Sequence, residues 1–176
     1  TPSFAPWGPY CKDDILPAVI LPATSLEGIT GTWNPASVST AVAGTAIYTF
    51  TPNAGQCAQP MTMSVVINPL PTASFGTITS PICTNSNAVF NINASANAVV
   101  NYSINGGVAS SVTADASGLA TVTVNNVSSD QTLTLVSVSN GTCSQSLSAS
   151  TTVTVTPTRT PSFAPWGPYC KDDILP

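Results

Sequence analysis

Histidine is absent from this chain, and charged residues make up only 6% of its 176 residues, against about 25% in an average soluble protein. Without histidine, catalytic pairs of the Ser–His or Cys–His type cannot form within this segment. The basic residues are only three: Lys12, Arg159 and Lys171. Nucleic-acid binding and attraction to anionic lipid both need more positive charge than this, so neither is expected.

Long apolar runs and helix-forming segments are also lacking. The longest apolar candidate, 15–21, is interrupted by Pro17 and is far shorter than the roughly 20 residues of a membrane-spanning helix, so direct membrane insertion is not expected. Glutamate occurs once, and 16 prolines and 11 glycines divide a chain rich in Thr, Val, Ser and Asn. This composition favours short strands over helices, so we predict an all-β protein.

One string of the sequence occurs twice. TPSFAPWGPYCKDDILP occupies residues 1–17 and again residues 160–176. An identity of this length indicates a tandem array, of which residues 1–159 are one period. Arrays of near-identical units extend reach and multiply sites, which is typical of a mechanical or display role and not of an enzyme. We therefore expect no catalysis.

The period itself contains two halves with a shared frame. Each half begins with Ser-Phe followed by a cysteine, and closes with a second cysteine, an alternating strand and a proline. Short strands separated by regular turn signals are typical of Greek-key sandwiches. We predict two tandem Ig-like Greek-key β-sandwich domains and the start of the next repeat, with boundaries at 1–70, 71–158 and 159–176.

Alternation and turn residues place the strands. Tyr48 and Phe50 alternate with Ile47 and two threonines, which gives one apolar face. In the first domain we expect strands near 15–21, 29–33, 45–51 and 61–67. In the second domain we expect them near 88–94, 99–104, 108–113, 119–124, 132–138 and 147–155. The turn signals of the second domain are Asn105-Gly106-Gly107, Asp115 to Gly118, and Ser139-Asn140-Gly141.

The cysteines favour disulfides over metal. The chain has no Cys-x-x-Cys and no histidine, so a zinc site is not expected. Cys170 is the copy of Cys11, and its partner would lie beyond this segment, which leaves four cysteines in the period. Disulfides indicate an oxidising compartment such as a cell surface.

Four cysteines can pair in three ways. The shared frame favours the way that keeps each bond within one domain. Each bond would then tie the first segment of a domain to the turn before its last strand. The predicted pairs are Cys11–Cys57 and Cys83–Cys143.

Several segments resemble a known family. GITGTWNP at 28–35, YTFTPNAGQC at 48–57 and TMSVVI at 62–67 are similar to repeat modules of giant flavobacterial (Bacteroidota) cell-surface and gliding-motility adhesins. NYSINGG at 101–107 and QTLTLVSVSNGTCSQSLS at 131–148 resemble the companion Ig-like module of those proteins.

The resemblance implies an extracellular filament at the cell surface, exported by the type IX secretion route and without catalytic residues. Other parts of the parent protein would provide the outer-membrane anchor and, in gliding species, the connection to the motility machinery. The expected partners are neighbouring repeats of the same chain, and surface polysaccharide or other cells.

Two groups of residues are candidate sites. Asp13 and Asp14 form the only close acidic pair, and this pair is repeated at 172–173. They could bind Ca²⁺ at a domain joint. They could also form only a solvated turn, because two carboxylates alone supply too few of the oxygen ligands that Ca²⁺ needs. No other cofactor is expected.

The second group is a cluster of aromatic residues among prolines. It could stack on sugar rings, or it could pack between neighbouring domains. Trp33 is separately expected in a core, near a disulfide. The cluster consists of Phe4, Trp7 and Tyr10, with Trp166 and Tyr169 in the copy.

The function that these observations favour is the shaft of a large extracellular adhesin or gliding-motility filament. Two alternatives stay open. The first is a self-assembling extracellular filament or sheath, and the second is a carbohydrate-binding accessory region of a secreted enzyme.

Overall fold

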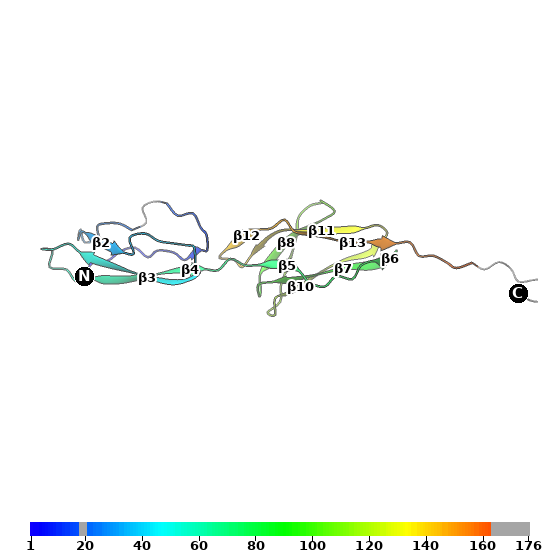
Figure 1. The fold of residues 1–176 in the computed structure, drawn as a ribbon, viewed down its shortest axis with the longest axis horizontal. Helices are drawn as coiled ribbons and strands as arrows, with labels where there is room; N and C mark the ends of the chain where they lie inside the picture. The colour runs from blue at the N-terminus through cyan, green and yellow to red at the C-terminus, as the bar shows by residue number, and fades with distance from the viewer. Residues whose placement is uncertain (18–20, 163–176) are drawn as a thin grey trace, which may run out of the picture.

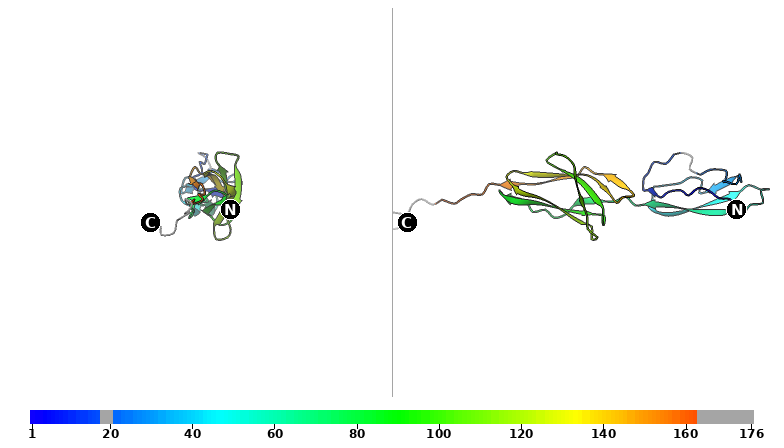
Figure 2. Two further views of the ribbon diagram at one scale, coloured as in Figure 1. Left: turned by 90° about the vertical axis from the view of Figure 1, so that its right-hand side faces the viewer. Right: turned by 180° about the vertical axis from the view of Figure 1, so that it is seen from behind.

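The structure is a computed structural model that describes residues 1–17 and 21–162. Within these ranges all regular secondary structure is β-strand, which confirms the all-β prediction. Two lobes lie end to end along one axis, and residues 69–72 connect them (Figure 1). The long axis passes through both lobes, so the view from one end is compact (Figure 2). None of the described segments is a helix of the length and hydropathy needed to cross a membrane.

The first lobe, residues 1–68, contains a single sheet with the strand order β1-β4-β3-β2. The strands are β1 (Tyr10–Cys11), β2 (Gly31–Asn34), β3 (Gly44–Pro52) and β4 (Met61–Asn68). β1 runs parallel to β4, and the other pairs are antiparallel. One face of this sheet carries the lobe's core, which consists of Trp33, Tyr48, Phe50, Val65 and Ile67.

Irregular chain, and not a second sheet, covers this core. Leu21, Ile29 and Val38 come from the segments outside the strands and pack against it. The sandwich predicted for the first domain is therefore only half formed by strands. The strand predicted near 15–21 is absent at 15–17 and at 21, while 18–20 lie outside the described residues. Pro17 lies within this stretch and Pro22 directly follows it, and neither has an N–H to donate to a ladder.

The alternation predicted for β3 is confirmed. Tyr48 and Phe50 are buried, whereas Ile47 is 66% exposed on the opposite face of the sheet. β2 runs antiparallel to β3, and at Gly31 the contact is so close that a Cβ atom would meet the Phe50 ring and the carbonyl oxygen of Thr51.

The second lobe, residues 73–156, is a sandwich of two sheets. One sheet has the order β10-β7-β5, and the other has the order β12-β11-β8-β9 with β13 also paired to β11. β6 and β14 form a separate parallel pair. The strands are β5 (Ala73–Phe75), β6 (Ile82–Cys83), β7 (Ser86–Ala94), β8 (Val99–Ile104), β9 (Ser110–Thr113), β10 (Leu119–Val127), β11 (Gln131–Ser139), β12 (Ser144–Ser146), β13 (Ser150–Val153) and β14 (Val155–Thr156).

The core of this lobe lies between the two sheets and is mainly aliphatic. Its largest members are Phe90, Ile92, Leu133 and Leu135, all fully buried. The predicted strands of this half correspond to β7 through β11. The strand predicted at 147–155 divides into β13 and β14, because the chain changes its partner from β11 to β6.

The turns of the second lobe are those that the sequence predicts. Asn105 and Gly106, between β8 and β9, have φ values of 51° and 70°, as a tight hairpin turn requires. Asp115 Oδ1 accepts hydrogen bonds from the backbone N–H groups of Ser117 and Leu119, at 2.8 and 2.9 Å. With Gly118 at φ 85°, this turn delivers the chain into β10.

The first cysteine of each lobe occupies the same position in its lobe. β1 lies parallel to β4, which leaves the first lobe, and pairs Cys11 with Asn68. β6 lies parallel to β14, which leaves the second lobe, and pairs Cys83 with Thr156. We call the end where the chain leaves a lobe its trailing end, and the end where the chain comes in its leading end. Cys11 and Cys83 both lie at trailing ends.

Candidate functional site

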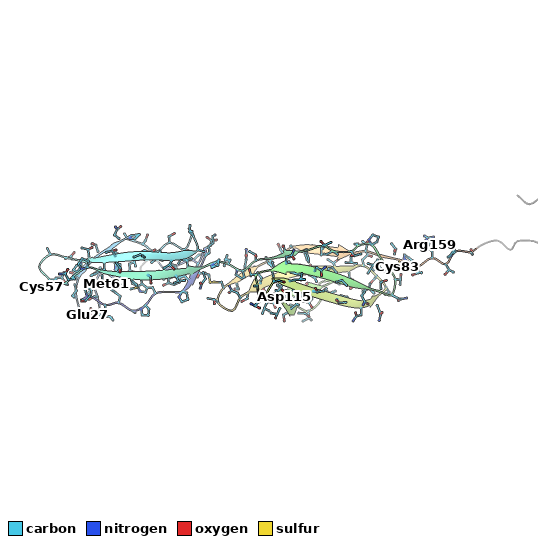
Figure 3. All side chains as sticks on the ribbon, turned by 90° about the horizontal axis from the view of Figure 1, so that it is seen from below. Glu27, Cys57, Met61, Cys83, Asp115 and Arg159 are labelled. Carbon is cyan, nitrogen blue, oxygen red and sulfur yellow. A yellow bond between two sulfur atoms is a disulfide. The ribbon has the colours of Figure 1, made fainter. Side chains whose placement is uncertain are left out.

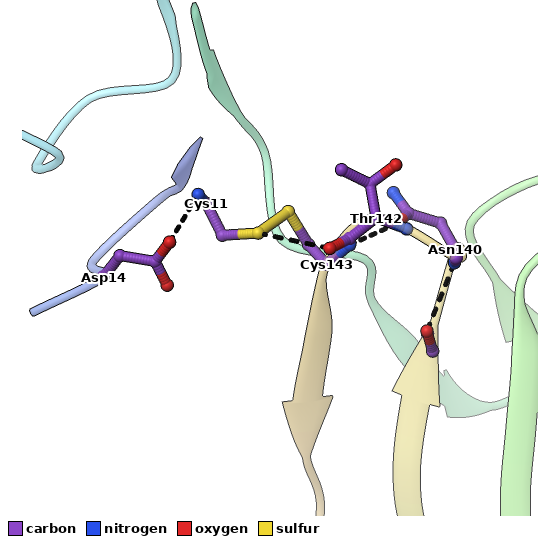
Figure 4. The surroundings of a disulfide bond; sticks show 7 residues. Cys11, Asp14, Asn140, Thr142 and Cys143 are labelled. Carbon is purple, nitrogen blue, oxygen red and sulfur yellow. Dashed lines mark hydrogen bonds between the residues drawn. A yellow bond between two sulfur atoms is a disulfide. The ribbon is translucent and has the colours of Figure 1, made fainter. Parts of the chain in front are cut away.

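The junction between the lobes holds a disulfide bond. Cys11, from the trailing end of the first lobe, is bonded to Cys143, from the turn between β11 and β12 at the leading end of the second lobe (Figure 4). The Cα atoms are 5.8 Å apart, and the two residues are 132 positions apart in the sequence.

Short local hydrogen bonds hold both cysteines in place. The N–H of Cys11 donates to Asp14 Oδ2 at 2.7 Å, and the N–H of Lys12 donates to the carbonyl oxygen of Asn68 at 2.8 Å. On the other side, Asn140 Oδ1 accepts from the N–H of Cys143 at 2.8 Å. The bond therefore joins two turns that each lobe orders by itself.

The predicted pairs Cys11–Cys57 and Cys83–Cys143 are wrong. Within each lobe the two cysteines lie at opposite ends. Cys11 pairs with the last residue of β4, whereas Cys57 precedes its first residue, so the eight residues of β4 separate them, about 25 Å of strand. A disulfide needs Cα atoms within about 7 Å.

The remaining cysteines of the described ranges, Cys57 and Cys83, are unpaired and exposed. They lie at the ends of the two lobes that face away from the junction (Figure 3). Cys170 lies outside the described residues. The sequence does carry a signal for this arrangement, namely the shared frame itself. The error is the assumption that each bond stays within one domain.

The disulfide gives the junction a second covalent connection. The first is the chain itself at 69–72, which contains two prolines, one of them fully buried Pro71. A hinge at a single linker would let the lobes swing, whereas two connections at separate points of the interface restrict that motion. This junction can therefore transmit tension and orientation from one lobe to the next.

The predicted aromatic cluster lies on the first lobe's own core. The centroid of the Phe4 ring lies 4.8 Å from the ring centroids of both Trp33 and Phe50, and the ring centroids of Trp7 and Trp33 are 5.1 Å apart. Tyr10 also packs against this core. The prediction that these rings pack between neighbouring domains is wrong, because the core has no second sheet and needs them as its cover. Trp166 and Tyr169 lie outside the described residues.

Trp33 is 8% exposed, which confirms its place in the core. Its Nε1–H donates to the carbonyl oxygen of Pro22 at 2.9 Å. It is not near a disulfide. Trp33 is paired with Phe50, and Phe50 with the first residue of β4, whereas Cys11 is paired with the last residue of β4.

Asp13 and Asp14 have different partners. Asp13 Oδ2 forms an ion pair with Lys12 Nζ at 2.5 Å, and Asp14 orders the Cys11 turn as described above. Within the described ranges no group of three or more acidic, cysteine or histidine residues is gathered as a metal site would require. Calcium binding at this joint stays a prediction. The copies Asp172 and Asp173 lie outside the described residues.

A further acidic residue orders the leading end of the first lobe. The Glu27 carboxylate accepts hydrogen bonds from both the hydroxyl and the N–H of Ser3, the latter at 2.8 Å, and from Ser25 Oγ at 2.8 Å. These bonds, led by that of the Ser3 hydroxyl, lower the pKa of Glu27 from 4.5 to about 2. This role of Glu27 could not be predicted from local sequence patterns, because its partner Ser3 is distant along the chain.

The comparisons with known proteins do not assign a family. No family model matches the chain, and no curated protein sequence matches it. Among solved structures, the fibronectin(III)-like modules of Clostridium thermocellum CbhA align with 13% identity and a TM-score of 0.39, over 74% of this chain and 72% of that one.

Two structures of the surface-layer protein SbsC also align. Domains 4 and 5 align with 19% identity and a TM-score of 0.28, over 82% of each chain. Domains 4–9 align with 18% identity and a TM-score of 0.28, over 73% of this chain and 20% of that one. These scores are too low to carry an argument about this chain, so its function is argued from its own residues.

Proposed function

We propose that the chain is one period of the shaft of a large extracellular surface protein, an adhesin or a gliding-motility filament. In this proposal the period consists of two domains, at 1–70 and 71–158, of which the first has one sheet and the second is a two-sheet sandwich, and residues 159–176 begin the next period. The shaft itself has no catalytic role. Its partners are the neighbouring repeats, while the anchor, the link to motility machinery and any glycan or cell ligand belong to other parts of the parent protein.

The observation that carries this proposal is the disulfide between lobes. A disulfide within a lobe would only stabilise that lobe, whereas Cys11–Cys143 connects two lobes in line. A binding module or an enzyme accessory domain does not need this connection, but a shaft that transmits force does. A disulfide also requires an oxidising compartment, which fits an exported protein.

The exact repeat supports the same conclusion. The segment copied at 160–176 contains the counterparts of Phe4, Trp7 and Tyr10, which pack on the first lobe's core, and of Cys11. The described chain leaves the second lobe on the side away from the first lobe (Figure 1), so in this proposal the next first lobe follows on that side. Serial lobes with few charges then form a long, weakly acidic stalk, with solubility provided by Ser, Thr and Asn.

Antibody-coated beads on live source cells test this function. The antibody is raised against the purified 176-residue chain, and beads coated with an unrelated antibody are the control. Beads that bind and travel along the surface would identify a driven gliding filament, and beads that bind and remain in place would identify a passive stalk. Absence of specific binding on intact cells would contradict a surface shaft.

A second measurement separates the shaft from the two alternatives. Light scattering of the oxidised chain is expected to show soluble monomers, whereas a self-assembling sheath predicts fibres. A glycan panel is expected to show no binding. Binding that is lost on Trp7→Ala, with the fold retained, would instead favour a carbohydrate-binding accessory region.

A further inference from the structure

The unpaired Cys83 has the same local setting as the bonded Cys11. Each is the last residue of a two-residue strand that runs parallel to the strand leaving its lobe. In each case the next N–H donates to the carbonyl oxygen of that strand's last residue, from Lys12 to Asn68 at 2.8 Å and from Thr84 to Thr156 at 3.0 Å.

The backbone then turns in the same way. Two residues after the cysteine, Asp13 has a φ of 64° and Asn85 a φ of 68°. Both are Asx residues, the type that tolerates this conformation best after glycine. Cys83 therefore occupies at the trailing end of the second lobe the position that Cys11 occupies at the trailing end of the first.

The unpaired Cys57 likewise corresponds to the bonded Cys143. Each is the cysteine of a Gly-x-Cys turn, and the two glycines, Gly55 and Gly141, both have a φ of 87°. Each turn comes directly after a strand of the lobe's core sheet, β3 or β11, and lies at the leading end. Cys57 differs from Cys143 in two ways: its φ is 49°, in the left-handed region, and it is exposed, because no lobe lies against it in this chain.

The chain path brings these two ends together in an array. In the first lobe the carbonyl oxygen of Ser3 accepts from the N–H of Leu26 at 3.0 Å, in the loop that also contains Thr30. Thr30 holds the Cys57 turn, since its N–H donates to Gln56 Oε1 at 2.8 Å. The chain thus begins the first lobe at the end that carries Cys57 (Figure 3).

The distance along the chain is also suitable. Cys83 is in register with Thr156, and the copy of Ser3 in the next period is Ser162. The connector between them is 157–161, close in length to the connector 69–72 of the bridged junction. Five residues span at most about 18 Å, so the chain keeps the two ends within about that distance of each other, as 69–72 does at the bridged junction.

We propose that Cys83 of each period forms a disulfide with the counterpart of Cys57 in the following period. This inference rests on the tandem array of the proposed function. Every junction of the shaft would then carry a disulfide between a trailing-end cysteine and a leading-end Gly-x-Cys turn. Bonds within periods would alternate with bonds between periods.

The chemistry is a thiol–disulfide exchange. The two thiols lose two protons and two electrons, and a sulfur–sulfur bond forms between them. A protein or small-molecule disulfide accepts the electrons, its own sulfur–sulfur bond breaks, and it leaves as two thiols. The oxidising compartment that forms Cys11–Cys143 supplies the same oxidant.

A chain extended by one full period tests this inference. Residues 1–159 are placed before the 176-residue chain, and the protein is oxidised in a buffer of reduced and oxidised glutathione. Peptide mapping without reduction is expected to find three disulfides: Cys11–Cys143 in each copy, and Cys83 of the first copy with Cys57 of the second. The two Cys11–Cys143 bonds show that both copies have folded.

Matched variants locate the additional bond. Cys83→Ser in the first copy is expected to abolish it and to add one maleimide-reactive thiol, whereas Cys83→Ser in the second copy leaves it intact. The same peptide pair is expected from the natural array on source cells.

Two outcomes would overturn the inference. Both cysteines could stay fully reactive toward N-ethylmaleimide while the Cys11–Cys143 bonds form, or Cys83 could bond to Cys57 of a different molecule and give dimers on a non-reducing gel. Either result alongside specific surface labelling would remove only the bond between periods. Failure of the surface labelling would instead remove the shaft itself.

Discussion

The two lobes reach a folded state by different means. The second lobe closes two sheets over a mainly aliphatic core, whereas the first has one sheet whose core is covered by irregular chain. The first lobe compensates with aromatic rings: Trp33, Tyr48 and Phe50 in the core, with Phe4 and Trp7 above them. Large rings bury much apolar area per residue, so a small lobe can form a core with few side chains.

The junction disulfide is expected to stabilise the first lobe more than the second. The second lobe has a complete sandwich, so it has its own source of stability. The first lobe is shorter and has fewer strands, and small domains are marginal without additional links. A bond from its first strand to a stably folded neighbour restricts its unfolded chain. The difference indicates that the second lobe serves as the support for the first.

Removal of one core ring is expected to give the largest contrast. Phe50→Ala and Phe90→Ala each delete a fully buried ring, at a cost of about 3–5 kcal/mol. We expect Phe50→Ala to unfold the first lobe, and Phe90→Ala to leave a destabilised but folded second lobe. Hydrogen exchange, read separately for each lobe, measures both effects.

The matched control for this pair is Ile47→Ala on the outer face of β3, which should change stability by less than about 0.5 kcal/mol. Equal loss of protection in both lobes after Phe50→Ala would contradict their independence.

Loss of the junction bond should have the next largest effect. The double variant Cys11→Ser with Cys143→Ser is expected to destabilise the first lobe by about 2–4 kcal/mol, because its unfolded chain is no longer constrained. The second lobe should change little. Small-angle scattering should also show a wider range of lobe orientations, since only the linker remains.

The control is Cys57→Ser with Cys83→Ser in the same 176-residue chain, which should leave both measurements unchanged. An unaltered first lobe in the junction variant would show that its aromatic core is sufficient.

Gly31→Ala tests the close contact between β2 and β3. The added methyl group would meet the Phe50 ring and the carbonyl oxygen of Thr51, and we expect a loss of about 1–3 kcal/mol in the first lobe only. Chemical denaturation followed by tryptophan fluorescence reports this, since Trp7 and Trp33 are in that lobe. Thr32→Ala, at the next and exposed position of β2, is the control and should have little effect.

Acid should act weakly on the leading end of the first lobe. Because the folded pKa of Glu27 is lowered from 4.5 to about 2, its stabilising effect is present above pH 4.5 and is lost as the pH falls toward 2. Glu27→Gln should therefore lower the Tm slightly at neutral pH, and the difference from the unmodified chain should vanish near pH 2.

Asp115 should have a similar effect in the second lobe, and hydrogen exchange measured separately for each lobe distinguishes the two. The Ser117 hydroxyl, followed by the N–H of Leu119, lowers the pKa of Asp115. A Tm difference for Glu27→Gln that persists at low pH would indicate a packing effect of the substitution.

Local patterns explain what could be predicted. Alternation in β3 and the Asn-Gly, Asp-x-x-Gly and Ser-Asn-Gly turns depend on residues close in sequence, so these strands and hairpins were predicted nearly to the residue. The cover of the first lobe was not predictable in this way. Its prolines prevent a regular strand near 15–21, and the replacement layer is built by contacts of Phe4 and Trp7 with Trp33, which is distant along the chain.

The sequence by itself determined the all-β class, the spacing of strands and turns, the copy at 160–176 and the shared cysteine frame of the two halves. These properties follow from local backbone preferences and from identity of residues. Only the tertiary structure decided which cysteines meet. A strand carries its two ends about 25 Å apart, so the cysteines of one lobe cannot reach each other, and Cys11 bonds instead to the lobe that lies against it.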